Sequence, residues 1–215
     1  MSKDWVGNSR SVYGTLGASN HVNTEREKND YYATSPITVE QFLNAFGDIL
    51  PKVWEPSCGG GHISEVLKKH GCDVLSTDLI DRGYGIGGID FFKVSKDDKF
   101  LTDWSKGLTF DIFTNPPYKY AEKYVLHALD LLPEGGRLIM FLKTSFLEGK
   151  SRKKNIYDVN PPRWVYQYSA RQGCAINGDF EGTFGSVEKA GGAVAYAMYV
   201  WYKHNDEKIT QVRWI

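Results

Sequence analysis

Short apolar runs recur along the chain, and most are followed by polar or glycine-rich residues, which predicts alternating strands and helices. Strands are expected at 52–55, 72–78, 108–113, 137–142 and 163–168, and apolar residues at helical spacing predict helices at 37–43, 62–70 and 120–132. Strands that alternate with helices form a mostly parallel sheet with helices on both faces. The run 137–142 is the most apolar, so we expect it at the centre of the sheet.

The two ends of the chain differ from this pattern. Residues 1–30 are polar and rich in Gly, Ser and Asn, which predicts either a flexible N-terminal arm that a ligand could order or simply a frayed terminus. At the other end, 194–202 and 209–214 predict a closing hairpin with 204–207 as its turn. Because 215 residues suit one core and no second composition zone appears, 31–215 is expected to form a single domain.

Composition limits the classes of protein to which this chain could belong. Lys plus Arg and Asp plus Glu both number 26, so nucleic-acid binding would need a local basic patch. The three cysteines, Cys58, Cys72 and Cys174, lack CxxC spacing, which argues against a disulfide framework or structural zinc and favours a reducing compartment. No histidine pair has ligand spacing, so no metal is expected. No signal-peptide core follows Met1, and no apolar run is long enough for a membrane span.

Acidic residues end two predicted strands around a glycine-rich loop. Glu55 ends the first strand and is followed by Pro56, Ser57 and Cys58 and then by Gly59 to Gly61, where a helix begins. Glycines let a backbone approach a ligand closely, although three glycines are also an ordinary turn. Asp78 ends the next strand, where a carboxylate can hold the two hydroxyls of a ribose. The alternative is a surface carboxylate beside Asp81 and Arg82.

The segment Asn115-Pro116-Pro117-Tyr118 follows the strand 108–113. Two prolines stop a central strand, and Pro116 restricts the backbone of Asn115. A stiff turn at the carboxyl end of a buried strand therefore presents one carboxamide, fixed carbonyls and an aromatic ring, at the edge where open α/β sheets bind ligands. By itself, this segment could be no more than a rigid strand-ending turn.

Taken together, these motifs resemble the class I S-adenosylmethionine-dependent methyltransferases, specifically the amino-methyltransferases that act on adenine in DNA. The resemblance covers about residues 30–145, and the tail 195–215 is similar to small phage-encoded adenine (N6) methyltransferases. It implies a Rossmann-like α/β fold: a seven-stranded, mostly parallel sheet with one antiparallel strand and helices on both faces. It also implies S-adenosyl-L-methionine as cofactor and a cytoplasmic location, in the host if the chain is phage-encoded.

The resemblance also implies roles for individual residues. Asp78 would hold the cofactor's ribose, with Leu79 beside the adenine, and Asp90 would bind the adenine amine, with Phe91 against its ring. The methionine part would be surrounded by Glu55, Pro56, Cys58, Gly59 and Gly61, and the catalytic segment would be Asn115, Pro116, Pro117 and Tyr118. Thr34 and Pro36 resemble a Thr-Pro segment that closes over the cofactor carboxylate, but here Ser35 lies between them.

The chemistry of the Asn-Pro-Pro-Tyr residues agrees with this resemblance. The exocyclic amine of adenine is a poor nucleophile because its lone pair is delocalised into the ring. If the Asn115 side-chain oxygen and the Pro116 carbonyl accept its two hydrogens, the nitrogen is drawn toward tetrahedral geometry and its developing charge is stabilised. Tyr118 would stack on the target ring, and the base must be flipped out or single-stranded to be reached.

The substrate is less constrained than the reaction. The basic run at Lys150, Arg152, Lys153 and Lys154 favours a DNA contact, although such runs are often solvated helix ends. The same motif also occurs in enzymes that methylate RNA bases or a protein glutamine amide. No target-recognition domain is evident, so specificity would come from segments 1–33, 143–160 and 173–193 or from a second subunit, as in a homodimer. A hypothesis of another class is a non-catalytic nucleic-acid-binding protein on a degenerate methyltransferase scaffold.

Overall fold

The computed structural model describes residues 31–176, 178–180 and 194–215; the predicted arm 1–30 and most of the predicted irregular loop 173–193 lie outside them. The strands are β1 (Tyr32–Thr34), β2 (Lys52–Glu55), β3 (Asp73–Ser76), β4 (Asp111–Thr114), β5 (Arg137–Lys143), β6 (Trp164–Gln167), β7 (Cys174–Ile176), β8 (Tyr196–Tyr202) and β9 (Gln211–Trp214). The α-helices are α2 (Pro36–Phe46), α3 (His62–Lys69), α4 (Lys99–Ser105), α5 (Ala121–Leu131) and α6 (Lys150–Arg152), the last continuing into a π-helical turn, η4 (Lys153–Tyr157). Three 3₁₀ turns complete the set: η1 (Phe91–Lys93), η2 (Tyr118–Tyr120) and η3 (Thr144–Leu147).

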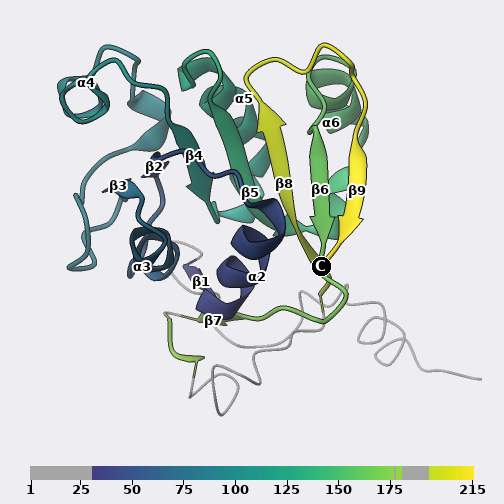
Figure 1. Ribbon diagram of the computed structural model, residues 1–215, viewed down its shortest axis with the longest axis horizontal. Helices are drawn as coiled ribbons and strands as arrows, with labels where there is room; N and C mark the ends of the chain where they lie inside the picture. Colours follow the sequence, from purple (N-terminus) through teal and green to yellow (C-terminus); the bar gives the residue numbers. More distant parts are fainter. Residues whose placement is uncertain (1–30, 177, 181–193) are drawn as a thin grey trace, which may run out of the picture.

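Seven strands form one sheet in the order β3-β2-β4-β5-β8-β6-β9. The pairs β2–β3, β2–β4, β4–β5 and β6–β9 are parallel, whereas β8 is antiparallel to both of its neighbours, β5 and β6. The predicted mostly parallel sheet with one antiparallel strand is therefore confirmed, and β5 lies at its centre as expected (Figure 1).

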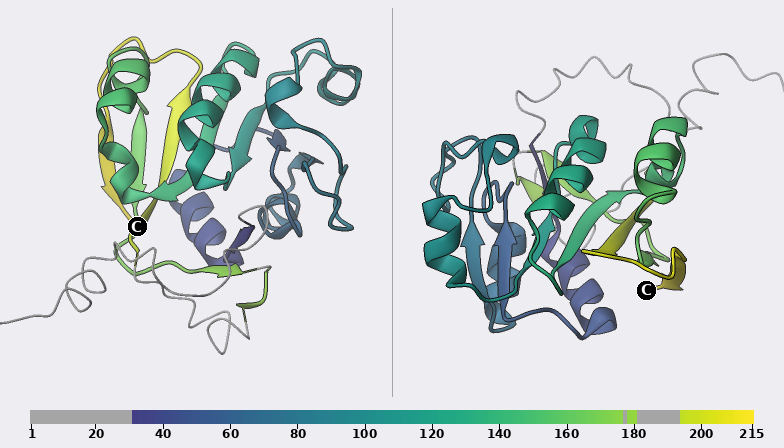
Figure 2. Two further views of the ribbon diagram at one scale, coloured as in Figure 1. Left: turned by 180° about the vertical axis from the view of Figure 1, so that it is seen from behind. Right: turned by 90° about the horizontal axis from the view of Figure 1, so that it is seen from above.

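Helices cover both faces of this sheet (Figure 2). Successive residues of β5 point to opposite faces, so Leu138 and Met140 pack with α4, α5 and η4, whereas Ile139 and Phe141 pack with α2 and α3. All four side chains are fully buried, which explains why this strand is a continuous apolar run rather than an alternating one. In the part of the chain that the structure describes, no helix combines the length and the apolar character that crossing a membrane would take.

The predicted closing hairpin is wrong. β8 and β9 are consecutive along the chain, but β6 lies between them and pairs with both: Trp164 is aligned with Val200 of β8 and with Gln211 of β9. The sequence of the connection, residues 203–210, does not indicate that an earlier strand occupies the position between β8 and β9. The order of these strands is set by packing between distant segments.

Asp90, which the family resemblance places beside the adenine amine of the cofactor, does not end a strand. Residues 79–88 fold back on the end of β3, where Thr77 and Ile86 form a single parallel bridge. Asp90 instead caps the turn η1, because its side chain accepts a hydrogen bond from the Phe92 amide (3.2 Å). The Asp90 side chain therefore serves as the cap of η1 in this structure.

A second, two-stranded sheet was not predicted. β1 and β7 pair antiparallel, with Tyr32 opposite Ile176 and Thr34 opposite Cys174. Figure 1 shows this small sheet at the end of the large one toward which β4 and β6 point. It places residues from distant parts of the chain beside the Asn-Pro-Pro-Tyr turn.

A buried ion pair joins β4 and β5 at their first residues. Arg137 donates through Nε and Nη2 to the two carboxylate oxygens of Asp111 (3.0 and 2.9 Å) and through Nη1 to Asp48 (2.7 Å). The Asp111 carboxylate also accepts the backbone amides of Leu50 and Arg137 (both 3.0 Å). Since the side chain of Asp111 is fully buried, these bonds replace its hydration and fix where the two central strands begin.

Candidate active site

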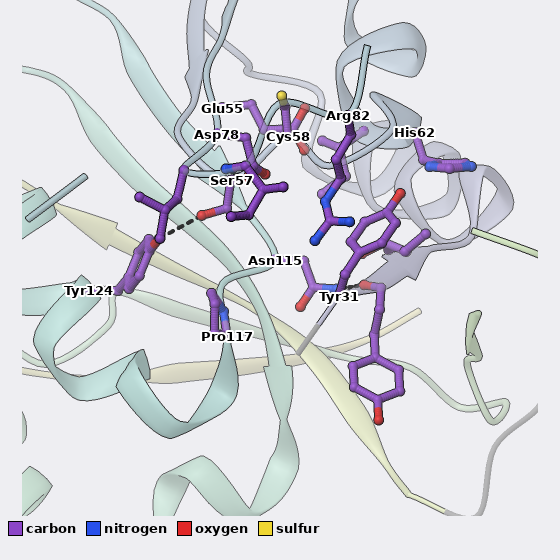
Figure 3. Close-up of a pocket in the computed structure, with 16 residues that line it drawn as sticks. Tyr31, Glu55, Ser57, Cys58, His62, Asp78, Arg82, Asn115, Pro117 and Tyr124 are labelled. Carbon is purple, nitrogen blue, oxygen red and sulfur yellow. Dashed lines mark hydrogen bonds between the residues drawn. The ribbon is translucent and has the colours of Figure 1, made fainter. Parts of the chain in front are cut away.

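A cavity of about 100 Å³, partly open to solvent, lies at the carboxyl ends of β2, β3 and β4 (Figure 3). β1 covers one side, and the loops after β2 and β3 cover others. The lining residues are Tyr31, Tyr32, Ala33, Thr34, Glu55, Ser57, Cys58, His62, Ile63, Asp78, Leu79, Ile80, Arg82, Asn115, Pro117 and Tyr124. Parallel strands that end at one edge bring their last residues together, which is why Glu55, Asp78 and Asn115 meet here.

Asn115 is held in one orientation at this cavity. Its Nδ2 donates to the backbone carbonyl of Tyr32 (2.9 Å), so the other atom of the carboxamide must be the oxygen. That oxygen, Oδ1, is buried and has no hydrogen-bond partner among the described residues. The carbonyl of Pro116 likewise accepts no bond from them, whereas the carbonyl of Pro117 accepts the Tyr120 amide (2.9 Å). Two neighbouring acceptors at the end of β4 therefore have no partner in the part of the chain that the structure describes.

Tyr118, the last residue of the motif, does not line this cavity. Its hydroxyl lies 3.5 Å from the thiol of Cys174, and its ring centre lies 6.0 Å from that of Tyr196. The ammonium of Lys143 lies 5.3 Å from the centre of the Tyr118 ring. Burial raises the pKa of the Tyr118 phenol well above its ordinary value, so the hydroxyl stays protonated. The ring is thus part of a polar cluster joining β7, β8 and the motif.

Glu55 is buried at the end of β2, with 1% of its surface exposed. Ser64 donates to its carboxylate, and the Ser64 and Ser76 hydroxyls lie 2.6 Å apart. Desolvation raises the pKa of Glu55 to about 8 despite the Ser64 hydrogen bond. The same burial raises the pKa of Cys58 to about 12, so its thiol is not a nucleophile at neutral pH.

Asp78 is oriented by backbone amides. Its Oδ2 accepts the Gly59 amide (2.8 Å) and its Oδ1 accepts the Ile80 amide (2.9 Å). Each carboxylate oxygen can accept further bonds, so hydroxyl groups of a ligand could be added without breaking these. The Gly59 contact ties the end of β3 to the loop after β2.

Aromatic rings of this chain pack closely on the glycine loop. The Tyr31 hydroxyl accepts the Gly60 amide (2.8 Å), and a Cβ on Gly59 would lie 2.2 Å from the Tyr31 ring. A Cβ on Gly61 would lie 2.4 Å from the Tyr84 ring, and Gly61 has φ +82°. The glycines were expected to let the backbone approach a ligand closely. In the structure, the rings of Tyr31 and Tyr84 occupy the space beside Gly59 and Gly61.

A second hollow adjoins the first and shares Leu79 and Tyr124 with it. Pro56, Asp90, Phe91 and Phe92 also line it. Phe91 is 2% exposed and stacks on Tyr124 with ring centres 4.5 Å apart, so one of its faces is already covered.

The structure brings many of the predicted residues together. The cavity is lined by Thr34, Glu55, Cys58, Asp78, Leu79, Asn115 and Pro117, and the hollow by Pro56, Leu79, Asp90 and Phe91. Gly59 and Gly61 lie in the loop between β2 and α3 and line neither space. Within the described residues, Pro36, Pro116 and Tyr118 line neither space. Pro36 is instead the first residue of α2, and Ser35 is the N-cap residue of that helix.

The residues of the predicted basic run differ in their contacts with the rest of the protein. Arg152 donates to the Phe146 carbonyl (2.8 Å) and stacks on the Phe146 ring, and Lys153 pairs with Asp158 (2.7 Å). Lys150 and Lys154 are exposed. Two of the four predicted nucleic-acid contacts are thus already engaged within the fold.

Sequence reasoning did not identify Tyr31, Ser57 or Tyr124 as site residues and treated Arg82 only as a neighbouring surface charge. Ser57 and Tyr124 share a hydrogen bond of 2.6 Å across the cavity. Tyr124 is a helix residue whose apolar neighbours indicated only a core face, so no local signal marked it. Among the described residues, no group of acidic, Cys or His side chains could hold a metal ion.

No protein-family model matches the sequence, and no curated protein does. Solved structures do share its fold. A "putative hemolysin" from Lactococcus lactis has TM-score 0.58 and 11% identity, over 83% of this chain and 91% of that one. The modification subunit of a "putative type I restriction enzyme" from Vibrio vulnificus has TM-score 0.58 and 10% identity, over 98% of this chain and 53% of that one. A "putative RNA methyltransferase" from Pyrococcus horikoshii has TM-score 0.50 and 14% identity, over 93% and 99%. The chain thus has the Rossmann-like fold found in solved methyltransferases.

Proposed function

We propose that this protein is an S-adenosylmethionine-dependent methyltransferase that modifies the exocyclic amine of adenine in DNA, with N6-methyladenine as product. The observation that carries the proposal is the Asn115 carboxamide: one end is held by the Tyr32 carbonyl, and the other presents a buried oxygen without a partner. A buried acceptor left unpaired is costly, so such an atom is expected to serve a ligand.

The cavity suits the cofactor that this reaction needs. Three of its lining residues have a buried polar atom without a partner among the described residues: Thr34 Oγ1, Arg82 Nε and Asn115 Oδ1. Asp78 would bind the ribose, Leu79 and the adjoining hollow would contact the adenine, and Glu55 with the glycine loop would hold the methionine part. When bound, S-adenosylmethionine supplies an electrophilic methyl group.

The chain's own residues would activate the amine. Asn115 Oδ1 and the Pro116 carbonyl accept its two N–H groups, which localises the nitrogen lone pair and stabilises the positive charge that grows on nitrogen during transfer. Both acceptors are fixed before substrate arrives, because the Tyr32 contact and the prolines hold them. No general base is needed before transfer, since the proton leaves after the new bond has formed.

Two observations favour adenine in DNA over other planar amines as the substrate. The modification subunit of a putative type I restriction enzyme has a similar fold, and Lys150 and Lys154 are exposed in the basic segment. Methylation of adenine in RNA or of a protein glutamine amide uses the same acceptor geometry, so these are the competing outcomes of the test.

The test is methyl transfer from labelled cofactor to four substrates: duplex DNA, single-stranded DNA, RNA and a bacterial protein extract. The proposal predicts label in DNA and, after digestion to nucleosides, N6-methyladenine. Label confined to RNA or protein would reject DNA as substrate. Failure of the wild type to bind S-adenosylmethionine in calorimetry would reject the methyltransferase itself and favour a non-catalytic binding protein.

A further inference from the structure

Arg82 lies in the loop after β3, and its guanidinium points into the cavity toward Tyr31 and Asn115 (Figure 3). The guanidinium carbon lies 4.3 Å from the centre of the Tyr31 ring. Its Nε is buried without a partner, and among the described residues no carboxylate forms an ion pair with it. An arginine cannot lose its charge in a protein, so a half-buried, unpaired fork is costly until a ligand satisfies it.

The loop that carries Arg82 is well fixed. The Ile86 amide donates to the Ser76 carbonyl (2.9 Å), and the Asp78 amide donates to the Ile86 carbonyl (3.0 Å). Asp81 accepts the Gly83 amide (2.9 Å), so the neighbouring acid is used to hold the turn rather than to pair with Arg82. The loop therefore holds the Arg82 guanidinium in a defined place, where it stacks on the Tyr31 ring.

Charge around the cavity indicates what this fork binds. His62 is the other basic residue of the lining, and burial lowers its pKa, so it is neutral at pH 7. Arg82 is then the cationic side chain of the described lining, in a cavity that also holds the carboxyl groups of Glu55 and Asp78. Arg82 is therefore placed to bind one anionic group of a ligand whose other groups contact Glu55 and Asp78.

We propose that Arg82, supported by Tyr31, binds the carboxylate of the cofactor's amino-acid part. This inference rests on the proposed function, and it differs from the expectation drawn from the family resemblance, which gave that role to the segment of Thr34 and Pro36. A planar carboxylate matches the guanidinium fork in two parallel hydrogen bonds. Tyr31 also bonds the Gly60 amide, so Arg82 lies on the side of the cavity next to the glycine loop, where the methionine part is expected.

The test pairs two ligands that differ only in this group: S-adenosylmethionine and its decarboxylated form. Calorimetry on the full chain would measure both dissociation constants for wild type, Arg82→Gln, Arg82→Lys and Arg213→Gln. Arg213 is the matched control, because it stacks on Trp164 at 4.2 Å and does not line the cavity. Thermal unfolding of each variant confirms that it is folded.

We expect Arg82→Gln to bind S-adenosylmethionine roughly 10- to 100-fold more weakly and the decarboxylated form within about twofold of wild type. Arg82→Lys should lose less, since it keeps the charge but not the fork. Equal effects on both ligands, or on neither, would overturn the inference. If the wild type binds neither ligand, the proposed function fails instead.

Discussion

The buried carboxyl group of Glu55 makes the stability of the fold depend on pH in a predictable direction. Desolvation raises its pKa from 4.5 to about 8 in the folded protein, and in the unfolded chain the group returns to its ordinary value. Between these two values the folded state keeps a proton that the unfolded state has released. The free energy of unfolding must therefore fall as pH rises through this window.

The size of the effect follows from the two pKa values. One pKa unit corresponds to about 1.4 kcal/mol, so the full change from below pH 4.5 to above pH 8 is about 5 kcal/mol. Because the side chain is 1% exposed, little of this effect is screened by solvent. The total free energy of unfolding of a domain is commonly about 5–15 kcal/mol, so a change of this size would be easy to measure.

The assay is urea unfolding of wild type and Glu55→Gln at intervals between pH 5 and 8. Glutamine keeps the shape and a Ser64 contact but does not titrate, so the difference between the two proteins isolates Glu55. We expect the stability of wild type relative to this variant to fall by about 4 kcal/mol over the range. Glu65→Gln is the control: Glu65 is exposed on α3, and hydrogen bonds from Tyr84 and Lys68 lower its pKa, so its difference from wild type should stay flat. A flat or rising difference for Glu55→Gln would refute the reasoning.

Two further substitutions test the framework of the site. Asp111→Ala leaves the guanidinium of Arg137 buried with only an exposed partner, and we expect the free energy of unfolding to fall by about 3–5 kcal/mol, measured by urea denaturation. Gly59→Ala should cost more than Gly47→Ala: both glycines have positive φ, worth about 1–2 kcal/mol against alanine, but only at Gly59 would the new Cβ overlap the Tyr31 ring. In a Tyr31→Ala background the two costs should become equal, and a persisting gap would show that the ring is not the cause.

The residues that end strands were predictable from the sequence because their signal is local. Glu55, Asp78 and Asn115 each follow an apolar run, and parallel strands deliver such ends to one edge of the sheet. The central position of β5 followed from its continuous apolar character. These features depend on strand length and burial, and both can be inferred from the apolar residues of a short stretch of sequence.

The parts that were not predictable depend on contacts between distant segments. β1 and β7 are three residues each and lie about 140 positions apart, so neither run indicates that Thr34 meets Cys174. The insertion of β6 between β8 and β9 is likewise invisible in the connection that joins them. Arg82 resembled a surface charge because nothing nearby in sequence indicates that it stacks on Tyr31 over a cavity.

The most direct test of the proposed mechanism is single-turnover methylation of adenine-containing DNA by wild type and Asn115→Ala, with N6-methyladenine measured by mass spectrometry. Asn44→Ala is the control, because that asparagine is exposed on α2 and does not line the cavity. We expect wild type and the control to form product and Asn115→Ala to be slower by roughly 100- to 1,000-fold, with its S-adenosylmethionine affinity changed only a few-fold. An Asn115→Ala protein that transfers the methyl group at the wild-type rate would contradict the account.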